Sequence, residues 1–312
     1  MTNTVLRRNL LSAGAAAAML ASAGMPSFAR AKQGGLLRAA LPGGMAGFDP
    51  RKMTGNLFAM AAAQGAVFDT LTQIGPDGVL QGELARDWRS DPSGLVWDIT
   101  LRADALFHNG KSFDARDAAA SLRLHQDPRS GAYHITNLIK RIQTPSRHRL
   151  RISLHSPRSD FPLLLSDYHL IMLPAPNIDR AMADGIGTGL YRPVHLADNL
   201  FEGRRVSTHY KDGQAGWFDE IRLTAVPDIK RGQDLLLARK VDAALMQDTN
   251  LPDGFTARQI PAQVTATPDL SRDPRPFAGH NIAHHTRLHI PASTSAVWPM
   301  DGARMAERWW MA

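Results

Sequence analysis

The stretch from residue 96 to residue 117 reads VWDITLRADALFHNGKSFDARD and holds the clearest structural signals in the chain. Its first six residues alternate between two faces and are rich in β-branched types, which is typical of a strand with one buried face. Asn109-Gly110 is a dipeptide favoured in hairpin-type turns, because both positions tolerate a positive φ. Asp114 can cap a helix running to about His125, with Asp117 near its positive N-terminus. The stretch therefore predicts a strand, a turn and a helix in succession.

Strand and helix signals alternate along the rest of the chain. Strands are expected at residues 36–41, 149–155, 221–226 and 241–246, and helices at residues 57–71, 161–166 and 232–238. This alternation predicts an α/β (mixed α+β) fold. No segment after the N-terminal region is apolar enough to suggest a membrane-spanning helix.

The first 31 residues have the pattern of a twin-arginine export signal. Arg7-Arg8 precede an uncharged run rich in Ala, Leu and Met that ends near Met25, and residues 29–31 (ARA) resemble a cleavage site. A membrane anchor is the alternative, but about 15 weakly hydrophobic residues are too few to span a ~30 Å core. We therefore expect residues 1–31 to be removed and the mature chain to be a soluble periplasmic protein.

Composition narrows the classes of function. The 312 residues include 36 Lys and Arg against 29 Asp and Glu, a formal net charge of +7. Removal of three signal arginines leaves 33 basic residues against 29 acidic ones, so nucleic acid is not expected as a partner. There is no cysteine, and the G-x-S-x-G, H-E-x-x-H and P-loop motifs are absent. We therefore expect a binding protein without a cofactor rather than an enzyme.

Five short segments and the C-terminal tail follow the order found in one protein family. They are Phe48-Asp49-Pro50, Gly82 to Trp88, Trp97 to Asp117, Gly187 to Tyr191, Lys240 to Ala244, and Met300 to Trp310. On these segments the sequence resembles the extracytoplasmic solute-binding proteins of dipeptide, oligopeptide, nickel and opine ABC transporters. The five internal segments cover roughly residues 35–250.

The resemblance implies a periplasmic-binding-protein fold of type II, in which two lobes close around a ligand. It places a first lobe at residues 32–250, with a small subdomain inserted at about residues 70–180. Residues 251–312 would form a residual segment whose C-terminal motif packs on the first lobe. Only about 50 residues separate Asp248 from that motif, so the second lobe is expected to be incomplete.

The resemblance also implies where a peptide-like ligand would touch the first lobe. Thr54, Gly55 and Asn56 match a family loop that approaches the ligand, and Tyr133 matches an aromatic position that contacts ligand in peptide-binding members. Thr and Asn can hydrogen-bond an extended peptide, and Tyr offers a flat apolar face with a polar tip. A plain turn and ordinary helix packing are the alternatives. The resemblance implies a permease in the inner membrane as a partner, and the paired arginines Arg7-Arg8 imply the twin-arginine export machinery as another.

A histidine cluster offers a second candidate site. His280, His284, His285 and His289 have the spacing H-x3-H-H-x3-H. On a helix, imidazoles four residues apart share a face and could bind a soft divalent metal. Prolines and a glycine flank the cluster, however, which favours an exposed and loosely structured segment.

Three hypotheses for the function follow from these patterns. The first is a peptide-class receptor that delivers solute to a permease. The second is a carrier of a metal or a nickel-type chelate that uses the histidine cluster. The third is a truncated remnant that binds no ligand. The segment Gly185-x-Gly187-x-Gly189 lacks the spacing of a dinucleotide loop, so we expect it to be a structural turn.

Overall fold

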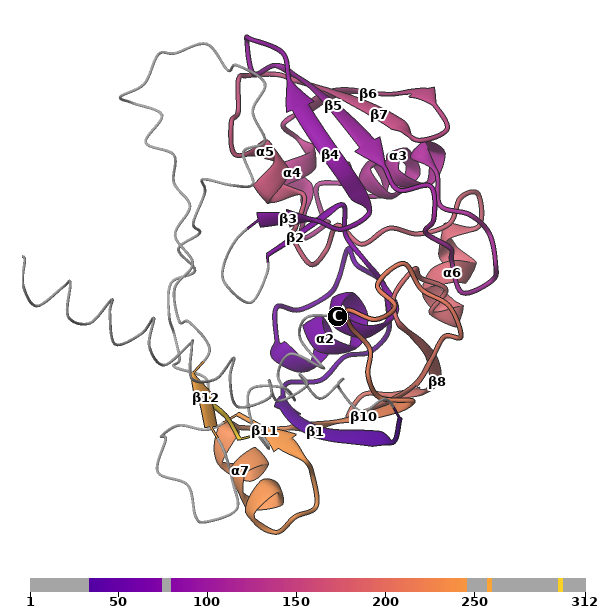
Figure 1. Cartoon of the computed structure of the whole chain (residues 1–312). Coiled ribbons are helices and arrows are strands. Elements are labelled where there is room, and N and C mark those ends of the chain that lie inside the picture. Colours follow the sequence, from indigo (N-terminus) through magenta and orange to yellow (C-terminus); the bar gives the residue numbers. More distant parts are fainter. Residues whose placement is uncertain (1–33, 75–79, 246–256, 260–296, 300–312) are drawn as a thin grey trace, which may run out of the picture. The chain divides into compact units, whose positions relative to one another are not determined.

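The computed structural model describes residues 34–74, 80–245, 257–259 and 297–299. The largest described sheet has the strand order β11-β1-β10-β9-β8 (Figure 1). In that order the strands comprise Ala243–Ala244, Leu36–Pro42, Glu220–Val226, Leu200–Arg205 and Tyr191–Ala197. Strand β1 is parallel to both neighbours, whereas β10, β9 and β8 pair antiparallel. Together with the helices described below, these strands confirm the α/β class expected from the sequence.

Helices cover both faces of this sheet at β1. Successive side chains of a strand point to opposite faces, so Ala39 and Leu41 pack with α2 (Leu57–Ala62), while Ala40 packs with α7 (Ile229–Leu237). A π-helical turn, η1 (Ala63–Val67), continues α2. Burial on both faces explains why β1 is mostly apolar.

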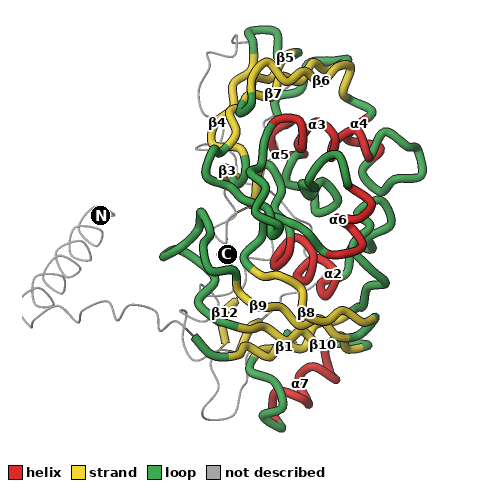
Figure 2. The backbone as a smooth tube through the Cα atoms, turned by 90° about the vertical axis from the view of Figure 1, so that its right-hand side faces the viewer, coloured by secondary structure: helices red, strands yellow, loops and turns green. Residues whose placement is uncertain are grey.

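A second, antiparallel sheet has the order β4-β5-β7-β6 (Figure 2). Its strands are Ala85–Ser90, Val96–Leu101, Arg149–Leu154 and Ile139–Ser146, and its core is completed by α3 (Ala115–Leu124), α4 (Tyr133–Thr136) and α5 (Phe161–Leu164). Trp97, Ile99 and Leu101 of β5 are buried in that core, whereas the residues between them are half-exposed. The strand predicted at residues 96–101 is therefore confirmed, with the expected one-sided burial.

The remaining described elements are short. They are the hairpin of β2 (Thr72–Ile74) and β3 (Leu80–Gly82), helix α6 (Ile178–Asp184), and the pair β12 (Ala257–Gln259) and β13 (Val297–Pro299). No helix within the described ranges is both long enough and apolar enough to cross a bilayer.

The start of α3 confirms the predicted cap. The side chain of Asp114 accepts hydrogen bonds from the N–H groups of Arg116 and Asp117, and the side chain of Asp117 accepts one from the N–H of Asp114. Asp117 is fully buried, and Lys111 Nζ lies 2.5 Å and 2.6 Å from its two carboxylate oxygens. A buried charge is tolerable here because a cation and backbone donors surround it.

The helix predicted at residues 57–71 ends earlier, at Val67. Residues 68–71 are not helical and cross from the core under the first sheet, which holds Phe68, to the core under the second, which holds Leu71. Their backbone groups bond to other segments: Met172 N–H donates to Asp69 O, and Leu84 N–H donates to Thr70 O. The helical spacing of apolar residues was misleading because both faces of this crossing segment are buried.

Other boundaries also differ from expectation. Helix α7 begins at Ile229 rather than at residue 232, because Asp228 caps it by accepting from Arg231 N–H. Of the strand predicted at residues 241–246, the structure assigns only Ala243–Ala244 among the residues it describes. Strands β2, β3, β4, β6, β8 and β9 were not predicted. The subdomain limits of about 70 and 180 stay a prediction.

The glycine-rich segment at residues 185–189 is a tightly packed turn. A Cβ on Gly187 would overlap the carbonyl oxygen of Val67, and a Cβ on Gly189 would overlap that of Ala66. His108 holds the turn, since Gly187 N–H donates to its Nδ1 at 3.3 Å and its Nε2 lies 2.8 Å from Gly189 O. Close backbone approach therefore explains these glycines.

We predict that Gly187→Ala lowers the free energy of unfolding by about 1–3 kcal/mol, because the backbone must shift to admit the methyl group. Gly65→Ala is the matched control, since its Cβ would meet its nearest neighbour, Met60 O, at an ordinary 3.7 Å. The control should be neutral or stabilising by about 0.4–1 kcal/mol. Urea unfolding of both variants measures the difference, and equal stabilities would contradict the packing explanation.

Candidate functional site

The loop that follows β1 carries three of the four predicted ligand-binding residues. Ligands of open α/β sheets bind at the carboxyl ends of parallel strands, and this loop leaves such an end. Asn56 caps α2: its Oδ1 accepts from Ala59 N–H at 2.9 Å, and its Nδ2 donates to Gly44 O and to Thr54 Oγ1. The hydrogen bonds of Asn56 therefore fix the conformation of the loop. Thr54 and Gly55 are exposed.

The loop before α4 lies against this first loop. Gly131 N–H donates to Arg51 O at 3.0 Å. Arg51 in turn forms two side-chain hydrogen bonds to Asp49, at 2.8 Å and 2.9 Å, and these hold the pKa of that carboxyl below its usual value. Tyr133 is the first residue of α4 and is half-buried. The structure thus brings the segments of all four predicted residues side by side.

A third segment, residues 167–169, completes the group and was not predicted. His169 Nε2 lies 3.2 Å from Met53 O, and its Nδ1 lies 2.7 Å from Asp167 Oδ1. The ring of Tyr168 stacks on that of His169 with centroids 3.9 Å apart. A Cβ on Gly55 would lie 2.9 Å from the Tyr168 hydroxyl oxygen. A side chain at position 55 would therefore crowd that hydroxyl.

We call residues 49–56, 127–133 and 167–169 the three-loop surface. Burial raises the pKa of Asp167, but the side-chain and backbone hydrogen bonds from His169 outweigh it and lower the pKa overall. Beneath the surface, burial lowers the pKa of His125 to about 4, with His169 contributing. His125 is therefore neutral near pH 7, and its Nδ1 lies 2.7 Å from Ser130 Oγ. The surface presents hydroxyls, a stacked aromatic pair and charges of both signs.

Sequence reasoning found part of this surface. Thr54, Gly55, Asn56 and Tyr133 lie in two of its loops, and their contact with ligand stays a prediction. Tyr168 and His169 were missed, because an aromatic residue and a histidine in a short loop carry no spacing signal. The histidine cluster at residues 280–289, the signal at residues 1–31 and the C-terminal motif lie outside the described residues. Among the residues that are described, no group of three metal-ligating side chains is found.

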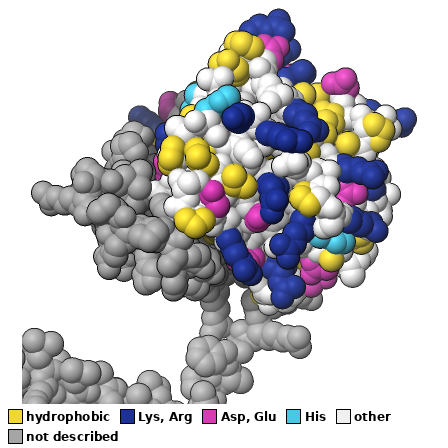
Figure 3. Space-filling view, turned by 90° about the horizontal axis from the view of Figure 1, so that it is seen from above, with side chains coloured by type: hydrophobic (Ala, Val, Ile, Leu, Met, Phe, Trp, Pro, Cys, Tyr) yellow, Lys and Arg dark blue, Asp and Glu magenta, His cyan; other side chains and the backbone are white. Residues whose placement is uncertain are grey.

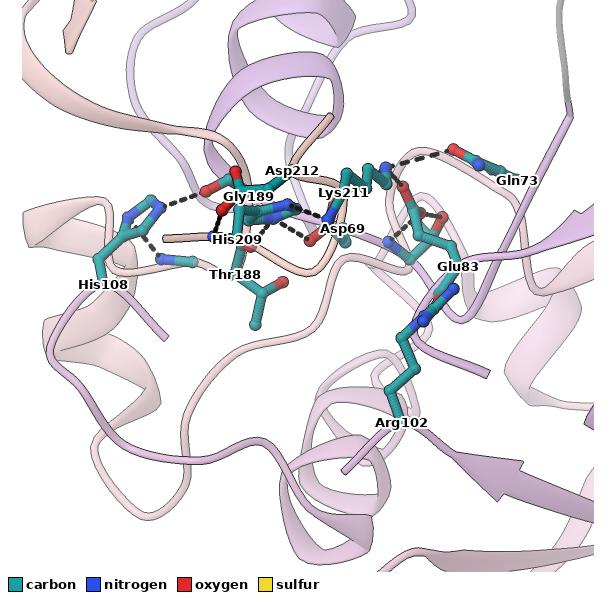
Figure 4. A network of polar contacts seen from close by, with 12 residues as sticks. Asp69, Gln73, Glu83, Arg102, His108, Thr188, Gly189, His209, Lys211 and Asp212 are labelled. Atoms are coloured by element: carbon teal, nitrogen blue, oxygen red, sulfur yellow. Dashed lines mark hydrogen bonds and ion pairs between the residues drawn. The ribbon is translucent and has the colours of Figure 1, made fainter. Parts of the chain in front are cut away.

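Figure 4 shows a buried ionic network around Lys211, Asp69 and Glu83. Asp69 lies between Phe68 of the first core and Leu71 of the second, so the network lies where the two cores meet. Lys211 Nζ is 2.6 Å from Glu83 Oε1 and 3.6 Å from Asp69 Oδ1, and all three side chains are at most 10% exposed. Glu83 Oε2 also accepts from Thr70 N–H at 2.8 Å. Lys211 belongs to the segment between β9 and β10, whereas Asp69 and Glu83 flank β2 and β3. The ammonium group therefore joins the segment around residue 211 to Asp69 and Glu83, which lie on either side of β2 and β3.

His209 extends the network. Its Nδ1 accepts from Lys211 N–H at 3.0 Å, so the ring proton resides on Nε2, which donates to Thr188 O at 2.8 Å. Arg102 lies over the ring of Tyr210 at 4.7 Å and donates to Glu83 O. These contacts tie the segment around residue 210 to the glycine-rich turn and to the second sheet.

The network contains two carboxylates and one buried ammonium group. Burial raises the pKa of Glu83 to about 7, and the charge of Asp69 adds to the increase, although Lys211 opposes it. The two carboxylates, Glu83 and Asp69, therefore take up a shared proton at a higher pH than an ordinary carboxyl does. All three side chains are buried and paired with one another, so the arrangement suits a structural junction.

We predict that this proton makes stability depend on pH. Above about pH 4.5 the unfolded chain has lost the proton of Glu83, but the folded chain keeps it to about pH 7. Stability should therefore fall as pH rises through this window, by up to about 1.4 kcal/mol per pH unit. Asp69→Asn removes the repulsion and should flatten the dependence. Chemical unfolding from pH 5 to pH 8 measures it.

The control for that measurement is Asp184→Asn, an exposed carboxylate paired with Arg180. Its pH dependence should match that of the unchanged chain. If the Asp69→Asn curve runs parallel to both, the shared-proton explanation is wrong.

The chain matches a known protein family and several curated proteins. Residues 79–273 match the family described as bacterial extracellular solute-binding proteins, family 5, middle. Curated relatives include the HTH-type transcriptional regulator SgrR of Escherichia coli K12, which is 27% identical over 166 residues. That match covers 52% of this chain and 29% of the regulator. The SgrR of Shigella flexneri is 28% identical over 167 residues.

Solved structures share the fold. NikZ from Campylobacter jejuni, determined with Ni(L-His), is 26% identical, with a TM-score of 0.63 over 72% of this chain and 47% of NikZ. DppA from Helicobacter pylori, determined with the peptide STSA, is 19% identical, with a TM-score of 0.64 over 75% of this chain and 52% of DppA. The chain thus spans about half the length of these structures. The family match covers more than half of the chain, and the chain belongs to the bacterial extracellular solute-binding proteins of family 5.

Proposed function

We propose that the three-loop surface binds short peptides or similar small solutes. The observation that carries the proposal is the half-buried Tyr168, whose hydroxyl lies beside Gly55 and whose ring lies against that of His169. Extended peptides are recognised by groups that hydrogen-bond their backbone and by flat apolar faces beside them. Thr54 is an exposed residue next to Gly55, and its hydroxyl accepts from Asn56 Nδ2. Tyr133 supplies a half-buried aromatic ring on the neighbouring loop.

Charge on the surface also fits a peptide. Asp127 and Arg129 are exposed and bonded to each other, with two side-chain hydrogen bonds at 3.1 Å and 2.7 Å. Asp49 and Arg51 form a second such pair on the adjacent loop. A zwitterionic ligand can meet partners of both signs on a surface of this kind.

In this proposal the chain is the substrate-binding component of an ABC importer. It would bind solute reversibly outside the cytoplasm, after export, and deliver it to a permease in the inner membrane without a covalent step. Family membership supports this role, and so do structural neighbours determined with peptides, such as DppA and a dipeptide-binding protein from Pseudoalteromonas with Met-Leu. NikZ, determined with Ni(L-His), supports a metal chelate as the alternative ligand.

We predict that di- or oligopeptides raise the melting temperature of the chain, because a ligand bound only by the folded state stabilises it by mass action. Tyr168→Ala and Tyr133→Ala should each weaken binding about tenfold, a cost of about 1.4 kcal/mol. Leu237→Ala, at an exposed apolar side chain of α7, is the control and should leave affinity unchanged. Thermal shift and calorimetry provide the measurements.

The outcomes separate the hypotheses. Stabilisation by nickel with histidine, and not by peptides, would replace the peptide with a chelate as ligand. No response to either would contradict solute binding and favour a remnant without ligand. Peptide binding that survives both Tyr substitutions unchanged would place the site elsewhere.

A further inference from the structure

The hairpin of β6 and β7 concentrates positive charge. Residues 139–154 contain five basic side chains and no Asp or Glu: Lys140, Arg141, Arg147, Arg149 and Arg151. All five are exposed. Figure 3 views the molecule from above Figure 1, the side on which the four-stranded sheet lies, and Lys and Arg side chains are gathered over it. We call these five side chains the basic hairpin.

Most of this charge has no acidic partner. Arg151 pairs with Asp98 of the neighbouring strand β5, at 2.7 Å. For the side chains of the other four, no ion pair or hydrogen bond occurs within the part of the chain that the structure describes. Unpaired guanidinium groups on one face produce a local positive potential that the small net charge of the whole chain conceals.

A hollow at the turn of the hairpin adds hydrogen-bond donors. It has a volume of about 400 Å³ and is lined by Asp114, Arg116, Thr144, Pro145, Ser146 and Arg147. The carboxylate of Asp114 is already engaged by the N–H groups at the start of α3. Two guanidinium groups and two hydroxyls remain, a donor set that suits the oxygens of a phosphate ester.

The chemistry of the face favours a membrane over other anionic partners. The outward side chains of β6 and β7 include no aromatic residue on which a nucleic-acid base could stack. They also include no large apolar anchor of the kind that carries the binding energy of protein interfaces. What remains is an exposed array of cations that can contact many phosphate groups at once, as polybasic segments do on anionic bilayers.

We propose that the basic hairpin docks the protein on the anionic phospholipid surface of a membrane. The contact is electrostatic and reversible, with phosphate headgroups entering the hollow at Arg116 and Arg147. The three-loop surface belongs to other segments of the chain, so docking does not require its residues.

The test is binding of the full chain to lipid vesicles, measured by co-sedimentation. Vesicles of phosphatidylcholine mixed with phosphatidylglycerol should bind the chain, and vesicles of phosphatidylcholine alone should not. The triple variant Arg141→Gln, Arg147→Gln and Arg149→Gln should lower the partition coefficient roughly 100-fold, because each basic residue near such a surface contributes several-fold. Raising the salt from about 0.05 M to about 0.5 M should release the unchanged chain.

The matched control removes the same charge elsewhere. Lys230→Gln, Arg231→Gln and Lys240→Gln lie at exposed positions in and after α7, and this triple variant should bind nearly as the unchanged chain does. If both triple variants lose vesicle binding equally, the loss follows from net charge alone, and the proposal is wrong. No binding to phosphatidylglycerol vesicles, or tighter binding to duplex DNA at the same salt concentration, would also overturn it. Melting temperatures of both variants check that they fold.

Discussion

The ammonium group of Lys211, buried between Glu83 and Asp69, is the interaction on which the arrangement of this molecule depends. A buried cation is stable only when carboxylates and hydrogen-bond acceptors surround it. Here those partners lie more than 120 positions earlier in the sequence, and Glu83 precedes Lys211 by 128 residues. The junction therefore closes only when the segments on both sides of β2 and β3 and the segment before β10 have folded together (Figure 4).

The three-loop surface depends on that junction. Residues 49–56 extend from the core beneath the first sheet and residues 127–133 from the core beneath the second. Residues 167–169 lie between Leu165 and Leu170 of the second core, and Tyr168 packs against the first. The hydrogen bonds from Gly131 to Arg51 and between His169 and Met53 join loops of different cores. A shift of one core against the other would separate Gly131 from Arg51. Affinity for solute would then change without any substitution in the site.

Local signals predicted much of the fold, and long-range packing explains what they missed. The cap at Asp114 and the alternation of Val96–Leu101 are decided by neighbours in sequence, and both are confirmed. The helical segment ends with η1 at Val67, where Gly187 and Gly189, about 120 residues later, pack against its backbone, and no local pattern contains these contacts. Tyr168 and the Lys211 network were missed for the same reason, because their contacts join residues that are far apart in the sequence. Net charge averaged over the chain likewise concealed the basic hairpin, which only its strand pairing assembles on one face.

Native-state hydrogen exchange, followed by mass spectrometry, tests the central role of the junction most directly. Amides of β5, in the second sheet, and of β10, in the first, should exchange with the same opening free energy, because the two cores unfold as one cooperative unit. In Lys211→Met, which leaves two buried carboxylates without their cation, β5 should open at a lower free energy than β10. Unequal protection in the unchanged chain, or equal protection of the two strands in the variant, would contradict the account.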